Sequence, residues 1–374
     1  MRILFWVGQL GDKFGSIERY NIQFAQKCRQ RGHEVIIMHD RPNTQPEYIQ
    51  GLEASGAKLV VIGDTYGDAK NAIFRLTNLI HIWKPDVVHI HFVNPLVLPV
   101  LKILKVPQIY KTWHTSIDSP ISLRTRLIRV VSNYTTTRIL AVSERVVQDE
   151  IRAGTRPGHI QKLYLGVPLC DLLATSSTDC DSPVPLGFNS LDRKVIISVG
   201  RFDEQKGMRY VTEAAVNVLN VCPEVIWWFV GRDGPEMSAS IEIVKKAGLE
   251  NKIFFLGQRN DVPSLMQRAY IQVVGSIYEG LGLMAVEAAA FGVPTVGTRI
   301  GGLDEAILDG VTGILVPRKS ASALAEATIH LLEHAALHDR LGQAAREHAF
   351  TNFDSDHLIS KLLNLYEFDS GSLI

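Results

Sequence analysis

The chain has 374 residues, of which 46% are hydrophobic and 21% charged, and its formal net charge is zero. This length is too great for one ordinary hydrophobic core, so we expect two domains. The composition excludes disordered and fibrous proteins, and no apolar run reaches the roughly 18 residues that span a bilayer. Four scattered cysteines (Cys28, Cys170, Cys180 and Cys222) exclude a disulfide framework and are typical of a reducing, cytosolic compartment.

The two halves of the sequence differ in charge. Residues 1–170 contain 22 Lys and Arg against 13 Asp and Glu, whereas residues 171–374 contain 17 against 26. The excess of positive charge in the first half favours an anionic partner, such as a lipid surface or a phosphorylated acceptor. The alternative is that both halves are simply solvated surfaces.

The first half alternates short β-branched or aromatic runs with longer amphipathic ones. Its first run, in MRILFWVGQLGDKFG, lacks a small-residue cleavage site, so we interpret it as a strand and not as a signal peptide. Helical periodicity predicts helices over Ile17–Gln30 and Lys70–Trp83. The predicted strands are Ile3–Val7, Val35–Met38, Lys58–Val61, Asp86–Ile90, Gln108–Thr112, Arg138–Val142 and Lys162–Leu165. This alternation predicts βαβ units and a mostly parallel sheet.

A stretch rich in Ser, Asp and Pro, residues 174–192, has no periodicity and predicts a linker. The βα alternation then restarts. Its predicted strands are Val195–Val199, Val225–Val230, Ile253–Phe255, Ile271–Val274 and Thr295–Thr298. Its predicted helices are Met208–Val221, Ser238–Ala247, Val262–Arg268, Leu283–Phe291, Ala321–Glu333, Ala335–His348 and His357–Tyr366. The sequence therefore predicts an α/β protein with two doubly wound domains in series, which bind ligands beyond the carboxyl ends of their strands.

Two turns that follow predicted strands carry groups suited to anions. In GDKFGSIERY (Gly11–Tyr20), backbone N–H groups near Gly15 and Ser16 could approach an anion at a helix N-terminus. The alternative is a plain turn, because neither a G-x-G-x-x-G nor a P-loop pattern is present. In ISVGRFDEQKG, Arg201 and Lys206 suit a diphosphate. A surface of mixed charge is the alternative there.

Three histidines fall near the carboxyl ends of predicted strands. Alternation places His89 and His91 on the same side of their strand, but no carboxylate or cysteine completes a ligand set at recognisable spacing. We therefore expect no metal site. His114 directly follows its strand, where sheets of this kind expose catalytic or substrate-binding groups.

Two carboxylates lie in the apolar segment SIYEGLGLMAVEAAAFGVPTVG. Glu279 is predicted at a strand-to-helix junction and Glu287 in the first helical turns, so both can face one ligand. The glycines between them leave backbone N–H groups bare at a helix N-terminus, which suits phosphate. Two merely solvated glutamates are the alternative, although a buried carboxylate needs partners.

One further run, PISLRTRLIRVV (residues 120–131), is basic and amphipathic. It suits a peripheral membrane surface that serves a lipid-linked acceptor. The alternative is a helix that is solvated on one face and packed on the other.

The segment from Glu279 to Pro317 resembles that of the retaining glycosyltransferases of family 4, which have the GT-B fold. The similar features are its E-x7-E pair and Gly301-Gly302 with Glu305. Further matches are VGRF…KG (residues 199–207), GRDGP (231–235), AVSE (141–144) and GSIERYNIQFAQKCRQRGHEV (15–35), so the resemblance spans nearly the whole chain. The departures are Ser16 where the family often has glycine, Leu165 where it has asparagine, and Gly275 where it has proline.

The resemblance implies two Rossmann-like domains facing each other across a cleft. We expect an acceptor domain over residues 1–173, a linker over 174–192 and a nucleotide-sugar donor domain over 193–356. A C-terminal helix over about 357–374 would cross back to the first domain and act with the linker as a hinge.

The resemblance also implies a role for each candidate. Arg201 and Lys206 would bind the donor diphosphate and offset charge on the leaving group. Glu279 would contact the donor sugar near its 3-OH, Glu287 the ribose hydroxyls, and His114 the sugar near its 6-OH. We expect His114, Glu279, Arg201 and Lys206 to be catalytic. The expected donor-binding residues are Gly15, Ser16, Arg201, Lys206, Arg259 (beside the base), Glu279, Gly280, Leu281, Gly282, Leu283 and Glu287.

The activity implied is that of a retaining hexosyltransferase in polysaccharide or glycoconjugate biosynthesis. It would move a sugar from a nucleotide-diphosphate sugar to a hydroxyl of a glycan, a lipid-linked molecule or a small molecule, by a metal-independent front-face displacement. No cofactor and no nucleic acid are expected; the donor nucleotide is expected to be UDP, with GDP as the alternative.

We expect a cytoplasmic protein, with a peripheral position at the inner face of the membrane left open. The alternatives in function are a sugar-nucleotide epimerase or phosphorylase of the same fold, or a non-catalytic nucleotide-sugar-binding module.

Overall fold

The computed structural model describes residues 1–8, 14–176 and 194–371. Contacts divide the chain into two compact units: unit 1 is Met1–Pro168 with Ser355–Ile374, and unit 2 is Leu169–Asp354. The predicted linker over residues 174–192 lies outside the described residues from residue 177 onward, and its first three residues end a short helix. No helix in the described ranges is long and apolar enough to cross a membrane.

Unit 1 contains a seven-stranded parallel sheet with the strand order β3-β2-β1-β4-β5-β6-β7. Its strands are β1 (Arg2–Val7), β2 (Glu34–His39), β3 (Lys58–Val61), β4 (Val87–His91), β5 (Gln108–Trp113), β6 (Arg138–Ala141) and β7 (Ile160–Lys162). Its α-helices are α1 (Ser16–Gln30), α2 (Pro46–Ser55), α3 (Ala69–Trp83), α4 (Val97–Ile103), α5 (Leu123–Thr135), α6 (Glu144–Arg152) and α15 (Ser355–Gly371). The strand order reverses between β1 and β4, which makes this the switch point of the sheet.

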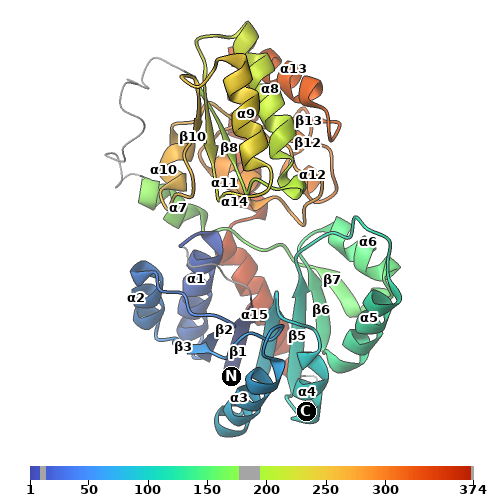
Figure 1. The fold of residues 1–374 in the computed structure, drawn as a ribbon. Coiled ribbons are helices and arrows are strands. Elements are labelled where there is room, and N and C mark those ends of the chain that lie inside the picture. The colour runs from blue at the N-terminus through green and yellow to red at the C-terminus, as the bar shows by residue number, and fades with distance from the viewer. Residues whose placement is uncertain (9–13, 177–193, 372–374) are drawn as a thin grey trace. The chain divides into compact units, whose positions relative to one another are not determined.

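Helices cover both faces of the unit 1 sheet (Figure 1). On one face, strand residues such as Phe5 pack against Phe24 of α1 and Tyr366 of α15. On the other face, residues such as Leu4 pack against side chains of α3 and α4, including Leu76. Because both faces are buried, the strands are nearly continuous apolar runs rather than alternating ones.

Unit 2 contains a six-stranded parallel sheet with the order β10-β9-β8-β11-β12-β13 and a switch point between β8 and β11. Its strands are β8 (Val195–Val199), β9 (Ile226–Val230), β10 (Ile253–Phe255), β11 (Ile271–Val274), β12 (Thr295–Thr298) and β13 (Gly313–Val316). Its α-helices are α7 (Leu169–Ser176), α8 (Met208–Val221), α9 (Met237–Ala247), α10 (Val262–Gln267), α11 (Leu283–Ala290), α12 (Leu303–Ala306), α13 (Ala321–Glu333) and α14 (Ala335–Asn352).

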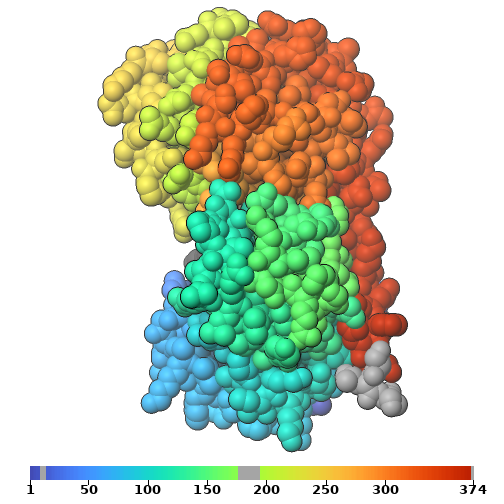
Figure 2. Space-filling model, turned by 90° about the vertical axis from the view of Figure 1, so that its right-hand side faces the viewer, coloured from blue at the N-terminus to red at the C-terminus, as the bar shows by residue number. Residues whose placement is uncertain are grey.

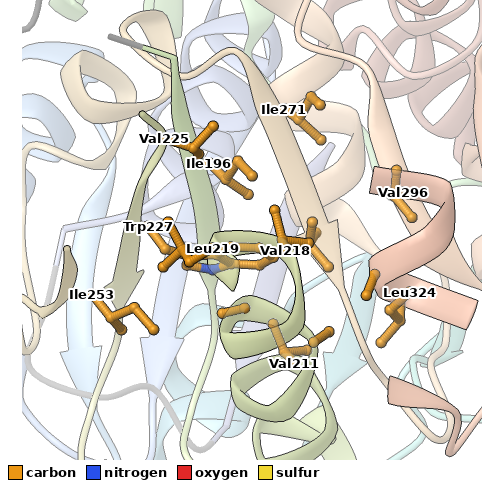
Figure 3. Packing of buried hydrophobic residues seen from close by; sticks show 14 of the residues in the cluster. Ile196, Val211, Val218, Leu219, Val225, Trp227, Ile253, Ile271, Val296 and Leu324 are labelled. Carbon is orange, nitrogen blue, oxygen red and sulfur yellow. The ribbon is translucent and has the colours of Figure 1, made fainter. Parts of the chain in front are cut away.

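The larger core of unit 2 lies between this sheet and helices α8, α9, α13 and α14. Val211 and Val218 of α8 belong to this core together with Ile196 and Trp227 of the sheet, and all four are labelled in Figure 3. The opposite face packs against α10 and α11, through residues such as Met266. Both sheets are thus held by apolar layers on two sides, which leaves their strand ends as the places for polar side chains.

The C-terminal helix α15 belongs to unit 1, where it packs against α1. Its residue Asp369 accepts hydrogen bonds from Tyr110 Oη at 2.6 Å and from Arg138 at 2.7 and 3.1 Å. The helix begins where the chain passes Gly166: a Cβ at that position would lie 2.4 Å from Ser355 Cα. Glycine at 166 is therefore required by the close approach of two backbone segments.

Most of the predicted elements are confirmed, and several have the predicted bounds. The strand predicted at Lys162–Leu165 is wrong, because β7 is Ile160–Lys162 and follows a 3-10 turn at Pro157–His159. The helix predicted to end at His348 continues to Asn352. Helices α2, α4, α6, α7 and α12 and strand β13 were not predicted. They are short, and Gly51 within α2 and Pro99 within α4 weaken the helical pattern.

Unit 1 also buries a cluster of charges. Arg129 donates to both carboxylate oxygens of Glu150, at 2.6 and 2.7 Å, and its guanidinium lies 3.8 Å from the centre of the Trp113 ring. Lys111 is 2% exposed and places its ammonium 4.1 Å from the same ring. Burial, and then the charge of Arg129, lower the pKa of Lys111 to about 7, while Glu150 opposes that shift. Glu150 is therefore the counter-charge for two buried cationic groups.

Replacing Glu150 by Gln is expected to destabilise the protein by about 3–5 kcal/mol, because the change leaves the buried Arg129 without its counter-charge. Urea unfolding followed by circular dichroism measures this loss. The double variant Arg129→Met with Glu150→Leu is the control, since it removes both charges together and is expected to cost less. Equal stability of Glu150→Gln and the wild type would contradict this role.

Candidate functional site

The candidate site of unit 2 lies at the switch point of its sheet. Strands β8 and β11 are neighbours, and the loops after them carry Arg201 and Lys206 on one side and Glu279 on the other. Since the carboxyl ends of parallel strands meet at one edge, these side chains come together although they are distant in the sequence.

Lys206 and Glu279 form an ion pair at this edge, with 2.5 Å between Lys206 Nζ and Glu279 Oε1. Ser276 Oγ donates to the same carboxylate oxygen at 2.8 Å. Thr298 Oγ1 in turn donates to the Ser276 backbone carbonyl at 2.5 Å, which ties β12 to the loop. Because Glu279 is only 8% exposed, these contacts replace the hydrogen bonds to water that its carboxylate loses on burial. No role was predicted for Ser276 from the sequence, although it lies three residues before Glu279.

Two glycines allow the two loops to approach each other this closely. Gly207 has φ +60°, and a Cβ there would lie 2.1 Å from the Gly275 carbonyl oxygen. A Cβ on Gly275 would meet a methyl group of Val211 at 2.4 Å. The glycine at 275, a departure from the family pattern, is thus explained by the packing of α8 against the end of β11.

The predicted cations Arg201 and Arg259 lie in other parts of this edge, each held by nearby side chains. Arg201 donates from Nε to Asp203 at 2.7 Å and from Nη2 to Gln205 at 2.9 Å, and it is about half exposed. Arg259 donates to both carboxylate oxygens of Asp261, at 2.8 and 2.7 Å. Neither pairing was predicted, and each keeps a guanidinium in a fixed orientation.

The loop from Gly280 to Gly282 leads into α11, whose first residue is Leu283. Gly282 is its N-cap, with φ +82°, and Leu281 is buried. Glu287 lies in the second turn of α11 and is 4% exposed. The expectation that neither glutamate of this segment is a simple solvated surface residue is therefore confirmed.

The start of α12 packs directly on this loop, because a Cβ on Gly302 would lie 2.4 Å from the Gly280 carbonyl oxygen.

In unit 1, two predicted histidines contact each other at the carboxyl edge. His91 Nδ1 and His114 Nε2 are 2.9 Å apart. Phe92, with φ +56°, stacks on the His114 ring at 4.0 Å between centroids. Burial, and then the charge of Lys111, lower the pKa of His114 to about 3, and burial lowers that of His91 as well. Both rings are therefore neutral near pH 7 and share one proton in their hydrogen bond.

The placement of His89 and His91 on one side of β4 is confirmed by their ring centroids, 4.1 Å apart. His89 bonds to Tyr366 Oη at 2.5 Å and to Thr112 Oγ1 at 2.7 Å, so both its nitrogens are used. Within the ranges that the structure describes, no group of three or more His, Cys, Asp or Glu side chains is arranged to hold a metal ion. The histidines of β4 therefore act as neutral rings that form hydrogen bonds to neighbouring side chains.

The turn before α1 differs from the expectation in one respect. Gly15 is the N-cap of α1 and Ser16 its first residue, but the Gly15 N–H donates to Glu18 Oε2 at 2.9 Å. An anion at this turn would have to compete with the Glu18 carboxylate. Gly11, at the start of the same motif, lies outside the described residues.

Two protein-family models match the chain. The model described as Glycosyltransferase Family 4 matches residues 17–170, and that described as Glycosyl transferases group 1 matches residues 187–348.

Among curated relatives, N-acetyl-alpha-D-glucosaminyl L-malate synthase of Bacillus anthracis is 32% identical over 47% of this chain and 46% of its own length. D-inositol 3-phosphate glycosyltransferase of Corynebacterium diphtheriae is 33% identical over 47% of the chain and 43% of its own length. The match thus spans about half the length of these two relatives. Phosphatidyl-myo-inositol mannosyltransferase of Mycobacterium leprae is 27% identical over 94% of this chain and 93% of its own length.

The fold is also similar to solved structures at low sequence identity. HepE of Anabaena, in complex with UDP, superposes with a TM-score of 0.79 and 20% identity over 98% of this chain and 100% of its own. Sucrose-phosphate synthase of Thermosynechococcus elongatus gives a TM-score of 0.78 and 19% identity, with 99% of both chains covered.

Two parallel doubly wound sheets, each with its polar groups at the carboxyl edge, define a protein of the GT-B fold class, as these structural neighbours do. With both family models matched along its length, the chain belongs to glycosyltransferase family 4.

The close approach of the two loops in unit 2 predicts the effect of an added methyl group. Gly207→Ala is expected to lower the thermal unfolding midpoint, because it combines a positive φ with a clash against a backbone carbonyl. Gly248→Ala is the matched control: Gly248 has φ +66°, yet nothing lies within 4 Å of its Cβ position, so only the cost of the left-handed conformation, about 1–2 kcal/mol, applies. Equal losses in the two variants would contradict the packing argument.

The contact between the two histidines predicts a single tautomer of His114. His91→Phe keeps an aromatic ring but removes Nδ1, so His114 is expected to lose its fixed tautomer and give averaged ring nitrogen resonances. Nitrogen-15 NMR of histidine-labelled protein measures this change. His338→Phe, in unit 2, is the control and should leave the His114 resonances unchanged. Unchanged resonances in His91→Phe would show that another group holds the tautomer.

Proposed function

We propose that this protein is a retaining glycosyltransferase that moves a sugar from a nucleotide-diphosphate sugar to a hydroxyl group of an acceptor. The observation that carries the proposal is the Lys206–Glu279 pair at the switch point of the unit 2 sheet, in a member of glycosyltransferase family 4. A cation and a carboxylate held side by side at a strand edge suit a ligand with a diphosphate next to a sugar.

Arg201 and Lys206 are proposed to bind the diphosphate. The Lys206 ammonium is neutralised by Glu279 when no ligand is present, and an arriving phosphate would share it. The half-exposed Arg201 supplies a guanidinium that can contact two phosphate oxygens. Both would offset the negative charge that grows on the nucleoside diphosphate as it leaves.

Glu279 is proposed to bind the donor sugar. Lys206 and Ser276 both bond to Oε1, which leaves Oε2 to accept a hydrogen bond from a sugar hydroxyl. Backbone N–H groups over Gly280, Leu281, Gly282 and Leu283 are proposed to bind hydroxyl or phosphate oxygens at the start of α11.

The remaining candidate residues are assigned either to the nucleoside part of the donor or, where they belong to unit 1, to the sugar and the phosphate. Glu287, on α11, is proposed to accept from the ribose hydroxyls, and Arg259 to lie beside the base. His114 is proposed to bond to a sugar hydroxyl as a neutral ring, because its lowered pKa excludes an imidazolium near pH 7. Gly15 and Ser16 are proposed to contact the donor phosphate, in competition with Glu18.

The proposed reaction is a front-face displacement. The acceptor oxygen forms a bond to the anomeric carbon on the face from which the diphosphate leaves, so the configuration is retained. The bond between the anomeric carbon and the phosphate oxygen breaks, and the acceptor proton passes to that phosphate. The counter-charges assigned to the leaving diphosphate are Arg201 and Lys206, not a metal ion.

UDP is the proposed donor nucleotide, with GDP as the alternative; the proposal is supported by the similarity in fold to HepE, which was solved with UDP and with UDP-glucose. The acceptor is proposed to be lipid-linked and reached at the cytoplasmic membrane surface. This is supported by the positive charge of residues 1–170 and by the similarity to a phosphatidyl-myo-inositol mannosyltransferase along most of the chain.

Incubation with UDP-sugars and lipid-linked acceptors is expected to release UDP in an acceptor-dependent manner. Lys206→Ala and Glu279→Gln are expected to lower kcat by about 10²–10³, because each loses an electrostatic contact at the reacting centre. Lys246→Ala is the control, since Lys246 forms a comparable Lys–Glu pair with Glu242 on the exposed surface of α9.

The products separate the alternatives. Isomerised UDP-sugar without release of UDP would indicate an epimerase, and sugar phosphate formed from inorganic phosphate would indicate a phosphorylase. Nucleotide binding without any turnover would indicate a binding module. Full activity of Lys206→Ala would refute the assigned role.

A further inference from the structure

Helix α5 has its apolar side exposed and its polar side buried. Four of its apolar residues recur at helical spacing along one stripe and are exposed: Leu123 (85%), Leu127 (64%), Val130 (44%) and Tyr134 (70%), whereas Ile128 and Val131 are half-buried. The residues that α5 buries are Arg129, Ser132 and Asn133. This is the reverse of the usual arrangement of a surface helix, which turns its apolar stripe to the core.

Specific polar contacts hold α5 in this orientation. Arg129 forms the buried ion pair with Glu150 of α6, and Asn133 Nδ2 donates to the Gly154 carbonyl at 2.9 Å. Asn133 Oδ1 also accepts from the Arg156 backbone N–H at 3.1 Å. Rotating the helix to bury the leucines would break these bonds and leave a buried carboxylate unpaired. The exposed stripe is therefore fixed by the fold.

Basic residues surround the stripe. Arg124 and Arg126 are exposed on α5 itself, and Lys102 and Lys105 are exposed at the end of α4, which packs against α5. Two further apolar side chains there, Leu96 and Ile103, are also exposed. We call this surface, formed by the exposed residues of 96–105 and 123–134, the α4–α5 face; it belongs to the cyan-to-green region of Figure 2.

The charge of the α4–α5 face is of one sign. Residues 96–105 and 123–134 contain no Asp or Glu, and their exposed basic residues are Lys102, Lys105, Arg124 and Arg126. A stripe of leucines with a tyrosine, flanked by arginine and lysine, is the pattern of a helix that lies in the interface of an anionic membrane. From Leu123 to Tyr134 the stripe extends over roughly 16 Å at 1.5 Å per residue.

We propose that the α4–α5 face docks this protein on an anionic lipid bilayer, with the α5 stripe inserted among the headgroups and the basic residues against lipid phosphates. This proposal rests on the proposed function, because docking would bring the protein to a lipid-linked acceptor. A neutral apolar partner would not account for the basic border, and a second copy of the same face would place like charges against each other.

The test is co-sedimentation of the full chain, without donor or acceptor, with vesicles of phosphatidylcholine alone or mixed with phosphatidylglycerol. The wild type is expected to bind the mixed vesicles and to lose part of this binding at high salt, which screens the charges. Arg124→Gln with Arg126→Gln is expected to weaken binding roughly 30-fold, since each basic residue near an anionic surface contributes a factor of about 5.

Leu123→Ser with Leu127→Ser is expected to remove the binding that persists at high salt. Both leucines are exposed, so thermal unfolding should be unchanged, which separates lost docking from misfolding. Lys245→Gln with Lys246→Gln on α9 is the matched control, because it removes two exposed positive charges from another surface and should bind as the wild type does.

Three outcomes would overturn the proposal: no sedimentation with anionic vesicles, equal binding of the arginine variant and the wild type, or a dimer in light scattering that the leucine variant abolishes. Transfer to a water-soluble acceptor analogue is measured separately. Failure to bind vesicles with that transfer intact would refute the docking face alone, whereas loss of all transfer with docking intact would refute the proposed function alone.

Discussion

The ion pair between Lys206 and Glu279 is the interaction on which the site of unit 2 depends. It joins loops that are 73 residues apart in the sequence, after the neighbouring strands β8 and β11. The close approach of these loops requires glycine at position 207, where a Cβ would lie 2.1 Å from the Gly275 carbonyl oxygen. The buried carboxylate is also stabilised by Ser276. The packing of the two loop backbones therefore brings Lys206 and Glu279 together. Their ion pair compensates the buried charge and fixes the position of the proposed ligand-binding groups.

In unit 1, too, buried polar groups determine how whole helices are placed against the sheet and against one another. Tyr366 bonds to His89, which joins the end of the chain to the centre of the first sheet. The pair of Arg129 and Glu150 fixes the rotation of α5 and so exposes an apolar stripe. Polar groups are costly to bury without partners, so each such contact favours one arrangement over its alternatives more sharply than apolar packing does.

Several features of the site could be predicted from local sequence. The apolar frame around Glu279 and Glu287 indicated that neither was a simple surface residue, and both are buried. The alternation of strands and helices predicted parallel sheets, because βαβ units leave few other arrangements. The pairing of Arg259 with Asp261 and the hydrogen bond from Gly15 to Glu18 were missed, although both are local. The spacing of residues in the sequence does not show whether such a group bonds to a neighbouring side chain or remains open to a ligand.

The sequence by itself determined the class of fold, the order of most elements and, through the spacing of its motifs, the family. Only the tertiary structure decided which distant groups meet: Lys206 with Glu279, His91 with His114, and α15 with the first sheet. It also decided that the apolar stripe of α5 faces outward. The reason is physical. Periodicity shows that an element has two sides, but which side is buried depends on the neighbours that strand order brings to it, and strand order is not encoded in any local pattern.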